Sequence, residues 1–419
     1  MAASDAPQQI DLDKCVHCGL CLNACPTYRE LGVEMDSPRG RIYQMVKVST
    51  GEAEITPSYI EHIDLCLACR GCETACPSGV QYGRLVEAAR AQIEQHIQRP
   101  FAVRLLRRLV FGYLLPSPLL LKIAGLGLYW FKATGMQSWA RSSGLISGRL
   151  AEIEKLSPPV ERPFFFSQIG KTFPAEGTRR YRVAFMAGCI ANVSFARLNE
   201  ATVRVLQKNG CEVVIPGGQG CCGALHLHSG LKAEAAKLAK VNVDAVMKGN
   251  FDAIVTNAAG CGSTLKEYDE LLDHDPLAVE FSKKMKDVSE FLASIELNTA
   301  MGPVNATVTY QDSCHLAHGQ KVRVQPRKLL AAVPGLKFKE MPMSDLCCGS
   351  AGIYNVVQNE MAMQLLEGKM RYVNGSGAEI IATANPGCML QLQAGVRLHG
   401  KGQRVAHVVE ILDEAYRAR

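Results

Sequence analysis

The fold of this chain is decided by one cysteine pattern that occurs twice, as Cys15-x-x-Cys18-x-x-Cys21-x-x-x-Cys25-Pro26 and as Cys66-x-x-Cys69-x-x-Cys72-x-x-x-Cys76-Pro77. Three thiolates at steps of three residues can wrap one iron–sulfur cube, whereas the fourth, displaced and stiffened by proline, points elsewhere. A zinc site and disulfide bonds are the alternatives. Zinc needs four ligands and usually separates its two cysteine pairs by about a dozen residues or more, so the pattern favours clusters.

The fourth cysteine of each run has a distinct role when a protein holds two clusters, because it then completes the ligand set of the other run. We therefore predict two [4Fe-4S] clusters. One ligand set is Cys15, Cys18, Cys21 and Cys76, and the other is Cys66, Cys69, Cys72 and Cys25.

The residues around the two runs predict helices. Ser37 is a suitable N-cap with Pro38 at the first helical position, and residues 58–65 and 83–98 carry two more helical patterns. The 40-residue spacer between Cys25 and Cys66 also suits a helical domain better than a small β-rich one. We expect a helical ferredoxin domain over residues 1–100.

Length, cysteine content and charge limit the classes of protein to which this chain can belong. With 419 residues the chain can form two or three domains. Seventeen cysteines behind a polar N-terminal start predict a reducing cytoplasm and metal binding, with no disulfides. The sequence has no basic stripe with interleaved aromatic residues, so we expect no nucleic-acid binding.

Residues 101–180 form a basic segment with 12 Lys and Arg against 4 Asp and Glu. Residues 101–131 are the most apolar part of the chain, but Pro116, Pro118 and Lys122 interrupt them, so we do not expect a transmembrane helix. Arginines beside leucines suit a helical hairpin lying in a membrane surface, on the inner face of the cytoplasmic membrane. The alternative is packing between the halves of the protein or against a partner subunit. Residues 155–180 are expected to be a connector.

Residues 181–300 and 301–419 are two copies of one pattern. Val183-Ala-Phe-Met-Ala-Gly-Cys189 matches Val308-Thr-Tyr-Gln-Asp-Ser-Cys314, Cys221-Cys222-Gly223 matches Cys347-Cys348-Gly349, and Ile254-Val-Thr-Asn-Ala-Ala-Gly-Cys261 matches Ile381-Ala-Thr-Ala-Asn-Pro-Gly-Cys388. The intervening lengths are 31 and 32 residues, then 38 and 39. Because both spacings agree to one residue, we interpret the two halves as an internal repeat.

Each repeat alternates strands with helices, which predicts a small α/β unit with a parallel sheet. The cysteines fall at strand ends or in the loops that follow, where such sheets usually carry their sites. Cys211 has no counterpart in the second repeat and is expected to be an ordinary buried thiol. The fold class is therefore α+β and multidomain, with the helical ferredoxin domain followed by two α/β domains.

The repeat cysteines could hold an iron–sulfur centre, hold a zinc ion, or form redox-active thiol pairs. Both copies keep the full set, so we favour metal or cluster binding by Cys189, Cys221, Cys222, Cys261, Cys314, Cys347, Cys348 and Cys388. His315 and His318 could be ligands or acid–base groups, although a hydrogen-bonding role is the expected one. His226 and His228 are expected to be surface or core residues.

These motifs together resemble the iron–sulfur subunits of bacterial glycolate oxidases, in the wider family with two cysteine-rich CCG domains. The resemblance covers nearly the whole chain. It is carried by Cys15-Val-His-Cys-Gly-Leu-Cys21, Asp36-Ser-Pro-Arg-Gly-Arg-Ile42, Cys66-Leu-Ala-Cys-Arg-Gly-Cys72, Cys76-Pro-Ser-Gly-Val-Gln-Tyr-Gly83, Gln311-Asp-Ser-Cys-His-Leu-Ala-His-Gly319 and Asn385-Pro-Gly-Cys388.

The resemblance implies a complex in which flavin subunits oxidise glycolate, or D-lactate, to the 2-oxo acid. This chain would pass the electrons to a membrane acceptor, quinone being the expected one. In the heterodisulfide reductase branch each CCG domain ends in Cys-x-x-Cys, whereas this sequence has Cys261-Gly-Ser-Thr264 and Cys388-Met-Leu-Gln391. The missing thiol argues against a non-cubane cluster in either repeat.

The chain has no Gly-x-Gly-x-x-Gly after a predicted strand, so we expect no flavin on it and a hydride acceptor on a partner chain. Electron transfer is the leading hypothesis. A thiol/disulfide reductase subunit built on the Cys-Cys-Gly repeats is the second, and a redox sensor or zinc-scaffolded interaction protein is the third.

Overall fold

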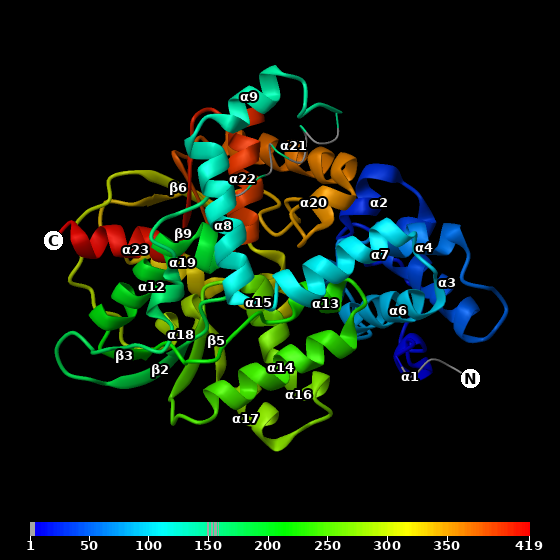
Figure 1. Ribbon diagram of the computed structural model, residues 1–419, viewed down its shortest axis with the longest axis horizontal. Coiled ribbons are helices and arrows are strands. Elements are labelled where there is room, and N and C mark those ends of the chain that lie inside the picture. Colours follow the sequence, from blue (N-terminus) through cyan, green and yellow to red (C-terminus); the bar gives the residue numbers. More distant parts are fainter. Residues whose placement is uncertain (1–4, 149–150, 152–153, 155–156, 158) are drawn as a thin grey trace.

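A helical N-terminal region, a strip of linker helices and two α/β units make up the chain in that order (Figure 1). The computed structural model describes residues 5–148, 151, 154, 157 and 159–419. The expected connector at 155–180 therefore lies in part outside the described residues. Its described part holds the 3₁₀ helix η3 (Phe165–Gln168) and the short strand β1 (Thr172–Phe173).

The N-terminal region is helical, as the sequence predicts. Its helices are α1 (Gln9–Leu12), α2 (Pro26–Leu31), η1 (Glu34–Asp36), α3 (Pro38–Ser49), α4 (Pro57–Asp64), α5 (Gly71–Thr74) and α6 (Tyr82–His96). Ser37 caps α3, since its Oγ accepts a hydrogen bond of 3.0 Å from the Gly40 amide. Buried residues of α3, α4 and α6, among them Ile42, Ile63 and Val86, share one core. That core includes Cys66 and Cys72, so it holds the second cysteine run in place.

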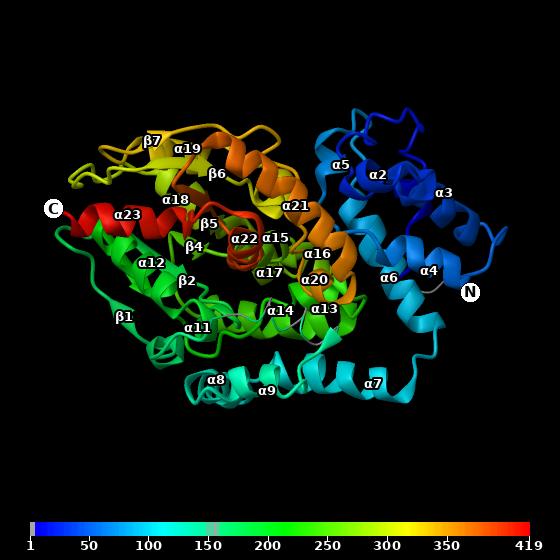
Figure 2. The ribbon, with the colours of Figure 1, turned by 90° about the horizontal axis from the view of Figure 1, so that it is seen from above.

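The linker helices lie along one side of the molecule (Figure 2). They are α7 (Phe101–Arg107), the π-helical η2 (Arg108–Leu114), α8 (Pro118–Ala133) and α9 (Met136–Ser142). One face packs on the first α/β unit, where Leu121 contacts the cluster of Phe164 and Val193. The opposite face leaves many apolar side chains exposed.

Among the described residues, no single helix is both long and apolar enough to cross a membrane. The pair Phe101–Leu114 and Pro118–Ala133 passes that test only when taken together, and it is bent by 110°. The bend falls at Ser117 and Pro118, where the sequence predicts the interruption.

The first α/β unit contains a five-stranded sheet. Its elements after β1 are β2 (Tyr181–Phe185), α11 (Ala191–Ser194), α12 (Ala196–Lys208), β3 (Cys211–Val214), α13 (Ala224–His228), α14 (Lys232–Val246), β4 (Ala253–Thr256), α15 (Ala259–Lys266), α16 (Tyr268–Leu271), α17 (Pro276–Lys284), β5 (Met285–Asp287) and α18 (Val288–Ser294). The strand order is β1-β3-β2-β4-β5. All neighbours are parallel except β1, an antiparallel edge strand that the sequence did not predict.

The second α/β unit repeats this arrangement without the edge strand. Its elements are β6 (Thr307–Tyr310), the π-helical η4 (His315–Gly319), α19 (Val324–Ala331), β7 (Lys337–Phe338), α20 (Tyr354–Val357), α21 (Asn359–Ser376), β8 (Ile380–Thr383), α22 (Pro386–His399), β9 (Arg404–His407) and α23 (Val408–Arg417). The order β7-β6-β8-β9 corresponds strand for strand to β3-β2-β4-β5, and every pair is parallel. The predicted repeat and its parallel sheets are confirmed.

The two α/β units share one hydrophobic core. Helix α23 of the second unit packs on α12 of the first, and α18 of the first packs on α19 of the second. A single cluster of buried residues runs through both, including Phe185 and Val213 on one side and Tyr310 and Leu412 on the other. The buried Asp413 carboxylate adds an ion pair between the units, since it accepts two hydrogen bonds of 2.8 Å from the partly exposed Arg204. The units therefore depend on each other for burial.

A large-to-small change in this shared core is expected to destabilise both units together. Leu412→Ala removes a fully buried side chain, so we expect a loss of about 3 kcal/mol in the free energy of unfolding. Anaerobic chemical denaturation followed by circular dichroism measures it. The control Leu398→Ala, at a side chain that is 45% exposed, is expected to cost about 0.5 kcal/mol. Two separate unfolding transitions, with only the later one moved by Leu412→Ala, would contradict a shared core.

Candidate iron–sulfur centres and the central cavity

The first three cysteines meet Cys76 at one cavity, which we call the first ferredoxin site. Its ligand candidates are Cys15, Cys18, Cys21 and Cys76. Pro38, Arg39 and Tyr82 line the same cavity. The fourth cysteine of the second run is therefore placed with the first run, which is the crossed arrangement that the sequence predicts.

The remaining four cysteines lie at a neighbouring cavity, the second ferredoxin site. Its ligand candidates are Cys25, Cys66, Cys69 and Cys72. Cys72 and Tyr82 line both cavities, so the two sites are adjacent. Burial raises the pKa of the Cys69 and Cys72 thiols well above the usual value. Bound iron would keep such buried sulfurs as thiolates, and four sulfur donors at each site suit an iron–sulfur cluster.

The two cysteine loops have the same backbone shape. His17 and Gly19 in the first loop and Ala68 and Arg70 in the second all have positive φ, between 51° and 83°. These are matching positions, two and four residues after the first cysteine of each run. The turns direct backbone amides inward, and the Ala68 amide lies 3.3 Å from the Cys66 sulfur as a hydrogen-bond donor. Hydrogen bonds of this kind to sulfur tune the potential of a bound cluster.

The repeat cysteines lie at corresponding places in the two α/β units. Cys189 follows β2 and Cys314 follows β6, while Cys261 and Cys388 lie in the first turns of α15 and α22. The Cys189 and Cys221 sulfurs are 3.6 Å apart. This hydrogen bond, followed by burial, raises the pKa of Cys189. Among the described residues, neither the ferredoxin sites nor the repeats hold a group of three His, Cys, Asp or Glu side chains arranged to bind a single metal ion.

Glycine makes the adjacent cysteines possible in each repeat. Gly349 has a φ of 87°, and a Cβ there would lie 2.4 Å from the Ala362 carbonyl oxygen. Gly223 has a φ of 81° beside Ala235 in the same way. The chain thus turns sharply and passes close to α14 or α21, which directs both thiols of each pair to the same side.

All eight repeat cysteines line one central cavity of about 380 Å³. The sequence predicts two separate sets, and the structure brings them to a single space between the units. The N-terminal region forms another wall, with Cys66, Leu67 and Arg90. Apolar side chains such as Phe195, Leu225 and Tyr354 complete the lining. The volume falls in the range of about 300 to 1,000 Å³ that is common for small-molecule sites.

The second repeat contacts the second ferredoxin site directly. Leu67 and Cys69 share a hydrophobic cluster with Cys314, Cys347 and Tyr354. The Tyr354 hydroxyl donates a hydrogen bond of 2.9 Å to the Leu65 carbonyl oxygen. These contacts place a cysteine of the second repeat beside a cysteine of the second ferredoxin site.

The histidines serve mainly as hydrogen-bonding groups, as expected. His315 Nε2 lies 2.9 Å from the Ala68 carbonyl oxygen, and His318 Nδ1 lies 2.9 Å from Thr74 Oγ1. Both therefore join the second repeat to the N-terminal region. His226 is a buried residue bonded to the Phe111 carbonyl oxygen, and His228 lines the central cavity with Nδ1 2.8 Å from Glu87.

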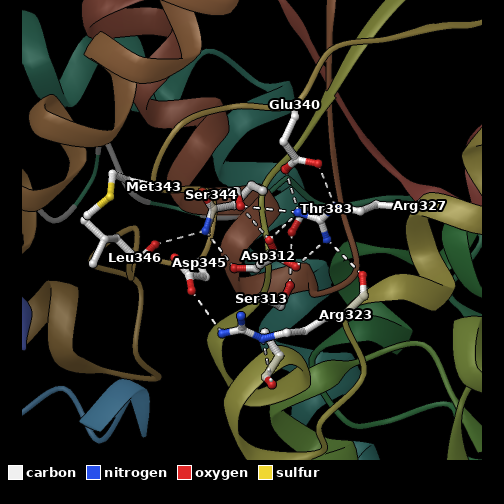
Figure 3. Close-up of polar contacts among 12 residues, drawn as sticks. Asp312, Ser313, Arg323, Arg327, Glu340, Met343, Ser344, Asp345, Leu346 and Thr383 are labelled. Atoms are coloured by element: carbon white, nitrogen blue, oxygen red, sulfur yellow. Dashed lines mark hydrogen bonds and ion pairs between the residues drawn. The ribbon is translucent and has the colours of Figure 1, made fainter. Parts of the chain in front are cut away.

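A polar network fixes the loop that carries Cys347 and Cys348 (Figure 3). Arg327 binds both Asp312 carboxylate oxygens, at 2.9 and 2.7 Å, and also binds Glu340. Ser344 donates to Asp312 at 2.7 Å. The buried Lys369 reaches the same loop through the Met343 carbonyl oxygen at 2.6 Å, and burial lowers its pKa to about 8. Because Asp312 precedes Cys314 by two residues, the network ties the two cysteine segments together.

Three family matches cover most of the chain. Residues 11–80 match the 4Fe-4S dicluster domain, and residues 183–266 and 308–393 match the cysteine-rich CCG domain. Residues 102–157 match the linker region of the glycolate oxidase iron–sulfur subunit. These matches and the cysteine sites define a multidomain iron–sulfur protein.

Similarity to known proteins narrows the class. The chain is 41% identical to the probable glycolate oxidase iron–sulfur subunit of Bacillus subtilis (strain 168), over 97% of this chain and 94% of that one. It is 32% identical to the glycolate oxidase iron–sulfur subunit of Escherichia coli (strain K12), over 96% and 94%. Lactate utilization protein A of Oceanobacillus iheyensis is 31% identical over 55% of this chain and 96% of its own. The chain belongs to the family of glycolate oxidase iron–sulfur subunits.

Removal of Arg327 is expected to destabilise the second repeat. Arg327→Ala leaves Asp312, whose side chain is 4% exposed, without its cationic partner, so we expect a loss of about 3 kcal/mol in the free energy of unfolding. Chemical denaturation of the purified protein measures it. The control Arg371→Ala breaks an ion pair in which Arg371 is 76% exposed, and is expected to cost about 0.5 kcal/mol or less. Equal effects of the two variants would contradict the role of the network.

Proposed function

We propose that this chain is the electron-transfer subunit of a flavin-dependent glycolate oxidase complex. The observation that carries the proposal is the adjacency of the cysteine sites. Cys72 lines both ferredoxin sites, Cys69 of the second packs with Cys347 of the second repeat, and that repeat opens on the central cavity. Electrons can therefore cross the chain through neighbouring sulfur sites.

The chain's own residues would hold two [4Fe-4S] clusters, one at each ferredoxin site. Bound clusters of this type supply one-electron transfer at potentials set by their surroundings. Cys25 and Cys76 cross between the two runs, and the positive-φ turns present amides to sulfur. Metal or cluster binding by the repeat cysteines is part of the same proposal.

Glycolate, with D-lactate as a second candidate, is the proposed substrate of the complex, because two relatives are glycolate oxidase subunits and a third is a lactate utilization protein. The hydride would be accepted by flavin on partner chains. The proposed final acceptor is a membrane quinone. The chain would then transfer electrons from the oxidation of a soluble substrate to a lipid-soluble acceptor.

A second candidate function is thiol/disulfide chemistry at the central cavity. It is favoured by one specific observation, that the eight repeat thiols line a single space with room for a small molecule. Alkylation of the cluster-loaded protein separates the two candidates. Unchanged glycolate-dependent electron transfer after alkylation would leave only the first.

Membrane attachment through the linker helices is the proposed location, as a peripheral protein on the inner face of the cytoplasmic membrane. The outward face of α7, η2 and α8 exposes large apolar side chains, including Phe101, Leu106, Leu109, Leu119 and Ile123. Arg104, Arg108 and Lys122 are exposed among them. Apolar side chains with interspersed cations are complementary to the surface of an anionic bilayer.

The crossed ligand sets are tested by single substitutions. In the anaerobically purified protein, the two ferredoxin sites should contribute about eight iron atoms per chain. Cys76→Ala is expected to remove the cluster of the first site and Cys25→Ala that of the second, each with a loss of about four irons. Iron analysis and EPR of the reduced protein measure this, with Cys211→Ala as the control that changes neither.

The electron-transfer role itself is tested in the complex co-purified with its partners. Cys25→Ala should abolish glycolate-dependent quinone reduction while a dye that accepts electrons directly from flavin is still reduced. Full quinone reduction by a complex whose subunit lacks iron would overturn the proposal.

Membrane attachment is tested by sedimentation with vesicles of phosphatidylglycerol and phosphatidylethanolamine. The triple variant Leu106→Gln, Leu109→Gln, Ile123→Gln should bind about a hundredfold more weakly, because each of the three side chains contributes roughly 1 kcal/mol when buried in lipid and about 1.4 kcal/mol is a factor of ten. The matched control is Val241→Gln, Leu277→Gln, Leu398→Gln, which alters three exposed apolar residues on α14, α17 and α22. Equal binding by both triple variants would contradict this location.

A further inference from the structure

Arg41 is a fully buried cation beside one of the two ferredoxin sites. It belongs to the segment Asp36-Ser-Pro-Arg-Gly-Arg-Ile42, whose side chains take no part in ligation. Its relative exposure is 0%, and its guanidinium lines the second site together with the four cysteines there. A buried charge is costly unless an opposite charge compensates it, so the partners of Arg41 decide its role.

The protein partners of Arg41 are mostly neutral. Its Nε donates a hydrogen bond of 2.6 Å to the His62 carbonyl oxygen, and both terminal nitrogens lie 3.2 Å from Thr27 Oγ1. The nearest carboxylate oxygen, on Asp36, is 3.4 Å away and also bonds His62 Nδ1 at 2.9 Å. The carboxylate therefore compensates the guanidinium only in part.

The cysteine sulfurs of the second site are the other groups near Arg41 that can carry negative charge. Burial opposes the charge on Arg41, but its pKa is raised because Cys66, Tyr82, Cys25 and Asp36 together outweigh that effect. Thr27 Oγ1 also lies 3.2 Å from the Cys25 sulfur, so Arg41 is one hydrogen-bonded residue away from a ligand. Cluster-bound thiolates would supply the negative charge that the guanidinium lacks.

In the part of the chain that the structure describes, the first ferredoxin site has no equally buried cation. Arg39 lies beside it on the same helix, but its side chain is 30% exposed and forms two hydrogen bonds to Glu34, at 2.7 and 3.2 Å. A solvated and fully paired charge acts weakly at a distance, whereas a buried and partly compensated one acts strongly. Reduction adds negative charge to a cluster, so a nearby buried cation favours the reduced state.

We propose that the buried guanidinium of Arg41 sets the second ferredoxin site at a higher reduction potential than the first. Arg41 is a positioning and tuning residue, since it touches the ligand shell and not a substrate. The inference rests on the iron–sulfur assignment proposed above. An electron that arrives at the first site would then move to the second, which is the site in contact with Cys347 and the central cavity.

The test is an anaerobic redox titration of the purified protein, followed by EPR, with iron content measured in parallel. Arg41→Gln should make one of the two clusters bind its electron about tenfold more weakly. For a one-electron couple this lowers the midpoint potential of that cluster by about 59 mV. The other midpoint should move by less than half as much. The control Arg39→Gln should leave the midpoint that depends on Arg41 unchanged.

Two further variants keep the test decisive if Arg41→Gln loses its cluster. Arg41→Lys retains the positive charge. The electron affinity of the same cluster should therefore stay within about threefold of that in the unaltered protein. Asp36→Asn removes the partial counter-charge and should shift the same midpoint upward, opposite to Arg41→Gln, which a merely loosened site would not do. Intact clusters with no shift, or shifts of the same sign in Arg41→Gln and Asp36→Asn, would overturn the role of Arg41. Absence of iron from the unaltered protein would instead overturn the proposed function.

Discussion

The crossing of Cys25 and Cys76 between the two cysteine runs is the constraint on which the rest of the N-terminal structure depends. Each cysteine is held at the site of the other run, and 50 residues of chain separate them. Helices α3, α4 and α6 must pack so that both crossings are satisfied at once, and their shared core contains Cys66 and Cys72. A ligand set drawn from two distant segments also means that each site forms only when the whole region is folded.

The two α/β units also bring cysteines from distant segments together, over a longer stretch of the chain. Their parallel strands present the segments after β2, β3 and β4 in the first unit, and after β6, β7 and β8 in the second, to one space that all eight repeat cysteines line. The second unit contacts the Cys66–Cys69 loop at Ala68 through His315, and contacts Leu65 just before it through Tyr354. The first unit contacts the residue that follows this loop, since Arg70 bonds Ser263 and forms an ion pair with Glu267. Both copies of the repeat therefore touch the second cysteine run, at different points.

Much of this arrangement could be predicted from the sequence because it depends on local spacing. The cysteine steps predict the two crossed sets, Ser37 and Pro38 predict the start of α3, and the matched intervals predict a repeated α/β unit with a parallel sheet. The positive φ of His17, Ala68 and Arg70 could not be predicted, since residues other than glycine rarely adopt it without support from neighbours.

The features that escaped prediction depend on distant contacts. In the sequence Arg41 looks like an ordinary helical arginine. Its role appears only when α4 packs beside α3 and the His62 carbonyl oxygen accepts a hydrogen bond from it. To predict the shared cavity, one must know how the two units face each other. The spacing of residues within one repeat carries no information about that. The edge strand β1 is only two residues long, too short to produce a recognisable alternation of apolar and polar residues.

The packing of α23 on α12 and of α18 on α19 couples the folding of the two units. The core of the first unit is complete only when α23 (Val408–Arg417) of the second covers α12, and that of the second only when α18 of the first covers α19. Domains usually fold in order of synthesis, N-terminal first. Here the earlier unit cannot finish folding by itself, so we expect it to expose apolar surface and to be prone to misassembly until the second unit docks.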